Sequence, residues 1–295
     1  MDLVTPVYRA AAVLAQNLPR PVVEGAVPRV AELWSLRPSD RRRMVESHQR
    51  RVQPQLDGPA LRRQVAGVYR SYGRYWAESF RLPAISDDEL DARLSVDGYE
   101  HIEDAIATGL GPITVLPHLG SWEWCAYWLA RVQGITVTAV VERLEPPALF
   151  DWFRDYRQRI GMEVVPLGPE AARSVTRAIK NQHIVALLSD RDIGGGGVTV
   201  DFFGEKTTLP AGPATLALRT GAALLPVGVY DRGGGGHHAV VRPPLDGERR
   251  GSLREDVARL TQEIACALED LIREAPEQWH LLQPNWPSDR GPVQL

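Results

Sequence analysis

The sequence predicts an α/β fold in which helices flank a central, mostly parallel sheet, with a helical extension at the N-terminus. Two observations lead to this prediction. From residue 113 onward, short apolar runs alternate with amphipathic segments of about ten to fifteen residues, the pattern of a parallel, wrapped sheet. Before residue 81, apolar residues recur at helical spacing. A chain of 295 residues with 44% hydrophobic content can bury a substantial core.

The N-terminal residues 1–80 are expected to be helical and to form one globular unit with a catalytic α/β part, residues 81–295. Apolar residues from Val4 to Leu18 can share one side of a helix, and a second helix follows Pro19 and Pro21. Between Leu61 and Phe80, apolar and aromatic residues recur at helical spacing. This aromatic stripe predicts core packing rather than cofactor binding.

The α/β part begins with a strand and then a helix between residues 96 and 110, after a connection at 83–91. The elements that follow are expected in the order strand 113–117, helix 121–132, strand 135–141, helix 146–160, strand 163–166, helix 169–180, strand 184–188, a long loop, helix 211–220, strand 223–230, strand 238–242 and helix 252–274.

Composition excludes several classes of function. A net charge of −3 gives no case for nucleic-acid binding. The two cysteines, Cys125 and Cys266, form neither a disulfide framework nor a zinc motif, so no metal site is expected. Only Lys180 and Lys206 are lysines, so any anion site must be built mainly from guanidinium groups, which suit phosphate.

The first forty residues suggest contact with a membrane surface. No apolar window is long enough to span a bilayer, and the N-terminus lacks a signal-peptide pattern. The two expected helices nevertheless combine apolar faces and Trp34 with arginines such as Arg29 and Arg37, a pattern typical of helices lying in a membrane interface. Packing against the protein's own domain explains the same pattern equally simply.

The most informative motif is Pro117-His118-Leu119-Gly120-Ser121-Trp122-Glu123. It places an imidazole at the carboxyl end of a strand and a carboxylate in the first turn of the next helix. Ligands bind at that edge of open α/β sheets. Glu123 could fold back, fix the tautomer of His118 and stabilise its charged form, as a general base requires. The alternative is a histidine that merely ends a strand.

Further residues follow other predicted strands, lie near helix ends or come after the glycine-rich loop at 194–197, and we consider them candidates for substrate binding. They are Glu142, Arg143, Arg157, Asp190, Arg191, Asp192, Phe203, Gly204 and Arg219, in addition to Gly120, Ser121 and Trp122. Charge this dense is costly to bury unless it meets a ligand or pairs internally, so residues 190–192 could equally form a structural ion-pair network.

No activated nucleophile is evident in the sequence. Gly-x-Ser-x-Gly is absent, which argues against an ordinary α/β-hydrolase. Ser121 is expected to cap the helix that follows it, and Cys125 to lie in the core. Residues 204–207, Gly-Glu-Lys-Thr, lack the order and spacing of a phosphate-binding loop.

The motifs together resemble the glycerophospholipid and late lipid A acyltransferases. His118 to Glu123 matches their His-x4-Asp/Glu block, and Asp190-Arg191-Asp192 with Phe202-Phe203-Gly204 matches a later block. Residues 210–227 and the Pro-Glu-Gln-Trp-His of 276–280 match the next two in order. Within this family, the chain looks most similar to the actinobacterial phosphatidylinositol mannoside acyltransferases, because an amphipathic N-terminus replaces a hydrophobic span and Asp-Arg-Asp replaces Asp-Gln-Asp.

This resemblance implies an acyltransferase-type fold and transfer of a long acyl chain, typically palmitoyl. Acyl-CoA would be the donor, as a co-substrate rather than a permanently bound cofactor, and the mannose 6-hydroxyl of a phosphatidylinositol mannoside would be the acceptor. The reaction would take place at the cytoplasmic face of the plasma membrane, to which a monomeric enzyme would bind peripherally.

In the mechanism we expect, His118 removes the acceptor proton, Glu123 supports His118, and backbone N–H groups of helix 121–132 stabilise the oxyanion without an acyl-enzyme. Trp122, Trp124, Tyr127 and Trp128 are candidate walls of an acyl slot, although core packing accounts for each as well. The competing hypotheses are transfer to lipid A or a lysophospholipid, thioester hydrolysis, and non-catalytic lipid binding.

Overall fold

The computed structural model describes residue 2 and residues 4–290. Residues 291–295, the end of the predicted catalytic part, lie outside the described residues. The fold is built around a seven-stranded sheet with the order β1-β9-β8-β2-β5-β3-β4. Its strands are β1 (Leu94–Asp97), β2 (Ile113–Leu116), β3 (Val137–Val141), β4 (Met162–Pro166), β5 (Ile184–Leu188), β8 (Leu224–Gly233) and β9 (Gly236–Val241).

Neighbouring strands of this sheet are parallel, except for the antiparallel pair β8–β9. The predicted mostly parallel α/β sheet is therefore confirmed. The strands at its centre are apolar on both faces, as buried parallel strands usually are. In β2, Ile113 and Val115 belong to one core cluster, whereas Leu116 belongs to another.

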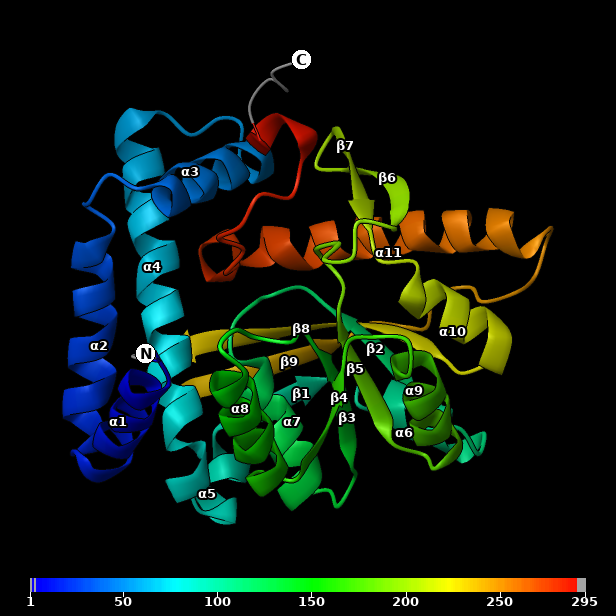
Figure 1. The fold of residues 1–295 in the computed structure, drawn as a ribbon, viewed down its shortest axis with the longest axis horizontal. Helices are drawn as coiled ribbons and strands as arrows, with labels where there is room; N and C mark the ends of the chain where they lie inside the picture. Colours follow the sequence, from blue (N-terminus) through cyan, green and yellow to red (C-terminus); the bar gives the residue numbers. More distant parts are fainter. Residues whose placement is uncertain (1, 3, 291–295) are drawn as a thin grey trace.

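Helices cover both faces of the sheet and complete a three-layer arrangement. The first core cluster joins the sheet to α9 (Ala171–Lys180), α10 (Gly212–Thr220) and α11 (Leu253–Glu274). The second joins it to α5 (Asp87–Ala92), α6 (Glu100–Ala107), α7 (Trp122–Arg131) and the end of α8 (Pro147–Arg159). In Figure 1, α11 lies above strands β8 and β9, and α7 lies below them.

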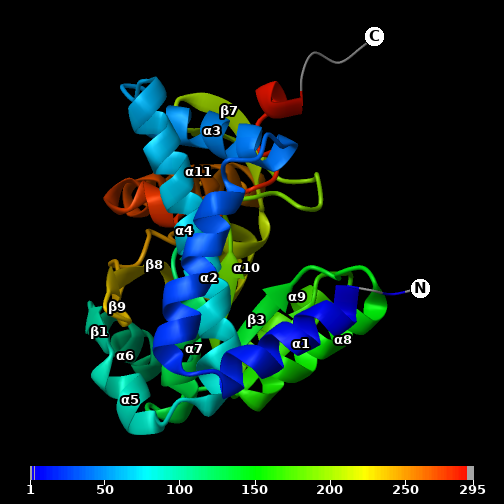
Figure 2. The ribbon, with the colours of Figure 1, turned by 90° about the vertical axis from the view of Figure 1, so that its left-hand side faces the viewer.

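The N-terminal region is helical, as the sequence predicts. It consists of α1 (Val4–Asn17), α2 (Arg20–Trp34), α3 (Asp40–Val52) and α4 (Gly58–Arg81). Figure 2 shows α2 running beside α4 and α1 beside α8. Ala77 and Phe80 of α4 pack with Phe153 of α8, so α4 connects the N-terminal helices to the α/β part. The division at residue 80 remains a prediction.

One β-hairpin was not expected from the sequence. Where we predicted a long loop, β6 (Val198–Phe202) pairs with β7 (Glu205–Leu209). Phe203 and Gly204 form its turn with φ angles of 51° and 76°, the left-handed geometry that tight hairpins require. The alternation of Val198, Val200 and Phe202 indicates a strand, but it was missed because polar and glycine residues surround it. The described residues also form the 3₁₀ helices η1 (Leu82–Ala84), η2 (Pro276–Gln278) and η3 (Pro287–Arg290).

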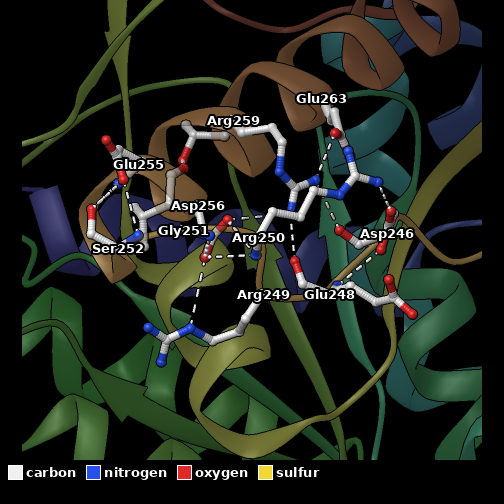
Figure 3. A network of polar contacts seen from close by, with 12 residues as sticks. Asp246, Glu248, Arg249, Arg250, Gly251, Ser252, Glu255, Asp256, Arg259 and Glu263 are labelled. Atoms are coloured by element: carbon white, nitrogen blue, oxygen red, sulfur yellow. Dashed lines mark hydrogen bonds and ion pairs between the residues drawn. The ribbon is translucent and has the colours of Figure 1, made fainter.

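A polar network fixes the start of α11 against the loop that follows β9 (Figure 3). Asp256 is 2% exposed and accepts hydrogen bonds from the backbone N–H groups of Arg250 and Gly251. Ser252 and Glu255 form a capping box at the helix start. The network therefore has a structural explanation that needs no ligand.

Within the part of the chain that the structure describes, no helix combines the length and the apolar character needed to cross a bilayer.

Candidate active site

His118 lies at the carboxyl end of β2, on the wall of a pocket of about 270 Å³. Its side chain is 32% exposed. Leu116, Ala139, Ala186 and Leu188 on strands β2, β3 and β5 also line the pocket, which therefore opens at the edge of the sheet that the sequence predicted.

The carboxylate that orients His118 is Asp190, from the end of β5. His118 Nδ1 and Asp190 Oδ1 are 2.7 Å apart, and the backbone N–H of His118 donates to Asp190 Oδ2 at 2.9 Å. When Nδ1 donates to a carboxylate, the lone pair of the neutral imidazole is on Nε2. The pair thus gives His118 the tautomer of a general base.

Asp190 is itself held rigidly. It is fully buried, and its Oδ2 also accepts the indole N–H of Trp279 at 2.8 Å. Its backbone carbonyl accepts a hydrogen bond from Asn285. Burial would raise the pKa of Asp190, but the charge of His118 and the hydrogen bonds from His118 and Trp279 lower it below its ordinary value. Asp190 is therefore a carboxylate poised to stabilise a protonated His118.

Glu123 does not orient His118 in this structure, contrary to the sequence-based mechanism. Its Oε1 accepts hydrogen bonds from Arg157 Nε at 2.9 Å and Arg157 Nη2 at 2.6 Å. Both side chains are largely buried, with 3% and 13% exposure. Burial lowers the pKa of Arg157, but Glu123 outweighs this effect and keeps it above the ordinary value. The first turn of α7 directs Glu123 to α8 rather than back to the strand end.

The Gly120–Ser121 turn separates His118 from α7. Gly120 has a φ of 56°, and a Cβ there would meet the carbonyl oxygen of Val229 at 1.9 Å, so only glycine fits. Its N–H donates to the carbonyl of Gln278. Ser121 was expected to cap α7 but makes no side-chain cap bond. Its hydroxyl donates instead to Glu78 of α4 at 2.8 Å.

Aromatic residues of α4 form another wall of the pocket. Tyr72, Tyr75 and Trp76 line it together with His280. His280 Nε2 lies 2.9 Å from the hydroxyl of Ser71, and burial, followed by the charge of His118, lowers the pKa of His280 to about 3. The ring of His280 is therefore neutral. The aromatic stripe that we predicted to be core is divided, because Tyr69 and Phe80 are buried whereas these three rings face the pocket.

Charged residues gather near the pocket. Glu142, Arg157 and Arg191 line it, as does Trp122. Arg143 is exposed beside Glu142, with its guanidinium 5.9 Å from the ring of Phe150. Among the described residues, Arg143 and Arg191 form no ion pair, whereas Arg157 is engaged by Glu123. Arg143 and Arg191 are therefore the cations best placed to receive an anionic group.

The candidate residues that do not line the pocket include Asp192, Phe203, Gly204 and Arg219. Asp192 accepts the N–H groups of Gly195 and Gly197 and shapes the glycine-rich loop. Phe203 and Gly204 form the β6–β7 turn. Arg219 belongs to α10, which ends just before β8 begins, and that end of β8 pairs with the start of β2. Arg219 thus lies at the edge of the sheet opposite His118.

A second, apolar cavity lies between the sheet and α7. It shares Leu116, Trp122 and Ala186 with the pocket of His118. Trp128 lines this cavity, whereas Trp124 and Tyr127 are buried without lining either space. Of the four aromatic residues considered for an acyl slot, Trp122 and Trp128 are thus in position to serve as its walls.

Sequence reasoning missed Glu78, Trp279 and His280 as residues of the site. The block at 276–280 was noted only as a family motif, and a single glutamate in a helix carries no signal of its own. Within the described residues, no group of histidine, cysteine, aspartate and glutamate side chains could hold a metal ion.

Comparison with known proteins identifies the family of the chain. A family model described as bacterial lipid A biosynthesis acyltransferase matches residues 4–288. The phosphatidylinositol mannoside acyltransferase of Mycobacterium tuberculosis H37Rv is 43% identical over 224 residues, which cover 74% of this chain and 69% of that protein. The protein of the same name from Mycolicibacterium smegmatis is 40% identical over 222 residues, which cover 74% and 71%.

A more distant relative is the lipid A biosynthesis acyltransferase of Haemophilus influenzae, 28% identical over 199 residues that cover 66% of this chain and 59% of that protein. The resemblance drawn from the sequence motifs is thus confirmed. The chain belongs to the bacterial lipid A biosynthesis acyltransferase family, a family of enzymes that transfer acyl groups.

Proposed function

We propose that this protein transfers a long acyl chain, palmitoyl, from acyl-CoA to the mannose 6-hydroxyl of a phosphatidylinositol mannoside. The observation that supports catalysis most directly is the His118–Asp190 pair on the wall of a pocket with both apolar and cationic parts. The acceptor class rests on the names of the relatives that are 40% and 43% identical.

His118 acts as the general base. Its Nε2 takes the proton of the acceptor hydroxyl as the oxygen attacks the thioester carbonyl, and Asp190 stabilises the resulting imidazolium. Backbone N–H groups at the start of α7 receive the negative charge that forms on the carbonyl oxygen. Collapse of the intermediate breaks the carbon–sulfur bond, and the departing thiolate takes the proton from His118.

The chemistry of the nearby side chains favours direct transfer without an acyl-enzyme. The hydroxyl of Ser121 is buried and donates to Glu78 rather than to His118, the general base of the site. Burial raises the pKa of the Cys125 thiol to about 12, so it is protonated at neutral pH and a poor nucleophile. The thioester is already activated, so attack by the acceptor hydroxyl needs only a base and an oxyanion site.

The acyl chain would occupy the apolar part of the pocket beside Trp122, and anionic groups would meet Arg143 and Arg191 at its rim. Arg157 would remain paired with Glu123, and its positive charge would still attract these anionic groups. Acyl-CoA is a co-substrate in this scheme, and a monomer suffices for catalysis.

The outer faces of α1 and α2 are suited to a membrane surface, which we propose to be the cytoplasmic face of the plasma membrane. Val7, Val30, Leu33 and Leu36 are between 61% and 70% exposed. Trp34 is 56% exposed, and Arg37 lies over its ring at 4.2 Å. A tryptophan and arginine among exposed apolar side chains are typical of peripheral helices that lie in the interface.

The test is mass spectrometry of the products after palmitoyl-CoA is mixed with a phosphatidylinositol mannoside, followed by fragmentation to locate the new ester. We expect one added palmitoyl group on a mannose 6-oxygen with the wild-type protein and none with His118→Ala. Parallel reactions with a lipid A precursor, with a lysophospholipid and without acceptor test the rival activities. Exclusive acylation of another acceptor, or release of free palmitate alone, would overturn the proposal.

A further inference from the structure

Glu78 is a buried carboxylate that the mechanism above does not use. It lies on α4, is 2% exposed, and reaches the turn between His118 and α7 from the N-terminal helices. Its Oε2 accepts the hydroxyl of Ser121 at 2.8 Å. Among the described residues, its Oε1 has no hydrogen-bond partner. A buried carboxylate that is incompletely bonded costs stability, so its presence beside the catalytic turn calls for an explanation.

The surroundings of Glu78 compensate for only part of this cost, because burial raises its pKa to about 7 against the charges of Arg74 and Arg93. His237 Nε2 lies 3.7 Å from Glu78 Oε2, beyond hydrogen-bond distance, and neither ring nitrogen of His237 has a partner among the described residues. Burial lowers the pKa of His237 to about 3, with Arg93, Arg74 and Arg20 adding to the effect, so the ring carries no charge to pair with Glu78. Within the described part of the chain, the one hydrogen bond to the Glu78 side chain is therefore that from Ser121.

The contact changes what Ser121 does. A serine that directly precedes a helix normally accepts a hydrogen bond from the backbone N–H of the second or third helical residue. Ser121 makes no such bond, and its backbone has φ −107° and ψ 61°. The hydroxyl is turned away from α7, toward α4. The first N–H groups of a helix have no partner within that helix. The N–H of Trp124 donates to the backbone carbonyl of Ser121 at 2.9 Å, and the N–H of Glu123, the second helical residue, is left uncapped by the Ser121 side chain.

We infer that Glu78 is a positioning residue for acyl transfer: by binding the Ser121 hydroxyl, it prevents Ser121 from capping α7 and keeps backbone N–H groups available for the oxyanion. This inference rests on the proposed function, because it concerns the same reaction. Gly120, anchored to Gln278 and confined by Val229, fixes the other side of the turn. The turn is thus held from α4, from β8 and from the C-terminal segment.

The inference predicts a specific pattern in a pair of substitutions. Glu78→Leu releases the Ser121 hydroxyl, which then competes for the α7 amides. We expect kcat to fall about 10- to 100-fold with KM for palmitoyl-CoA within threefold, since oxyanion contacts act in the transition state. Adding Ser121→Ala removes the competing hydroxyl, and the double variant should recover at least tenfold in kcat. Glu78→Gln retains an acceptor oxygen and should stay within about fivefold of wild type.

Asp256→Leu is the matched control, because Asp256 is equally buried but lies at the start of α11 (Figure 3). It should lower thermal stability while kcat per folded molecule stays within threefold. Circular dichroism establishes which variants are folded. If Glu78→Leu is folded and as active as wild type, or if Ser121→Ala fails to restore its activity, the inference is overturned. If Glu78→Leu does not fold, a loss of more than fivefold in folded Glu78→Gln overturns it.

A second readout separates this inference from the proposed function. Hydrolysis of palmitoyl-CoA without acceptor requires the same oxyanion contacts, and the same ranking of variants is expected there. If the wild-type protein neither transfers nor hydrolyses the acyl group, the proposed function fails. In that case, hydrogen exchange of segment 119–124 tests the inference independently of catalysis. In Glu78→Leu the released Ser121 hydroxyl should cap the α7 amides and slow their exchange, and unchanged or faster exchange contradicts the inference.

Discussion

His118 and Asp190 are joined by two contacts, one from the ring and one from the backbone. Nδ1 of His118 lies 2.7 Å from Oδ1 of Asp190, while the His118 N–H donates to Oδ2 at 2.9 Å. Because one carboxylate holds both the imidazole and the chain that carries it, the orientation of the ring is tied to the geometry of the strand ends. A base fixed in this way loses little entropy when the acceptor hydroxyl arrives.

Replacement of Trp279 tests the support of this pair. Trp279→Phe removes the indole N–H that donates to Asp190 Oδ2 at 2.8 Å but keeps an aromatic ring. We expect the unfolding free energy to fall by roughly 1.5–3 kcal/mol, the range for a hydrogen bond to a charged group. Steady-state kinetics should show kcat reduced about tenfold, because Asp190 is less firmly held.

Trp286→Phe is the control for that experiment. Trp286 is equally buried, and its indole N–H donates to the carbonyl of Phe202 at 3.1 Å rather than to Asp190. This variant should lose stability but keep kcat within about twofold. Equal losses of kcat in the two variants would show that Trp279 acts only through general packing.

The Glu123–Arg157 pair should contribute to stability. Glu123→Gln leaves Arg157 with an uncompensated charge at a site where it is only 13% exposed. Breaking one side of a buried pair costs roughly 3–5 kcal/mol, which urea unfolding would detect. Asp87→Asn breaks the exposed pair with Arg131 and should cost less than about 1 kcal/mol. Similar values for the two variants would contradict the buried placement of Glu123.

Glu78 should make stability depend on pH in a defined direction. Burial raises its pKa to about 7 from 4.5, against the hydrogen bond from Ser121 and the charges of Arg74 and Arg93. Between these values the folded protein binds a proton that the unfolded chain releases. The contribution of Glu78 to stability is therefore present below about pH 4.5 and is lost as the pH rises toward 7.

Glu78→Gln should remove this dependence. Relative to wild type, the variant should gain about 3 kcal/mol in unfolding free energy between pH 4.5 and pH 8, measured by urea titration of both proteins at each pH. Parallel pH profiles of the two proteins would mean that Glu78 is not buried as a titrating group.

Contact with membranes should depend on the exposed face of α2. Val30→Glu with Leu33→Glu places two charges where the side chains are 61% and 65% exposed, so folding should be little affected. Binding to phosphatidylglycerol-containing vesicles should fall at least tenfold in a sedimentation assay, because two apolar side chains can no longer be buried in the lipid. Thr199→Glu, on the hairpin, is the control and should bind like wild type. Unaltered binding of the double variant would rule out this face.

The sequence predicted the main sheet well because its strands are short apolar runs separated by glycines, prolines and amphipathic helices. It failed at β6–β7, where five-residue strands carry polar residues on one face and follow a glycine-rich segment. Packing against α11 and Trp286 stabilises that hairpin, and such long-range packing cannot be predicted from a local sequence pattern.

The site shows the same division between local and long-range information. The spacing from His118 to Glu123 correctly indicated a histidine at a strand end, but not the partner of its ring. That partner, Asp190, is 72 residues further along the chain and is brought close by the parallel pairing of β2 with β5. The side chain of Glu123, in the first turn of α7, instead points toward Arg157 and accepts its hydrogen bond.

The most direct test of the central claim is the rate of acyl transfer by Asp190→Asn, measured on protein shown to be folded. An asparagine keeps the size of the side chain but cannot stabilise the imidazolium. We expect kcat to fall about 10²–10⁴-fold, as for loss of general-base assistance, with KM for palmitoyl-CoA changed less than threefold. A folded Asp190→Asn enzyme with kcat within a few fold of wild type would contradict the account.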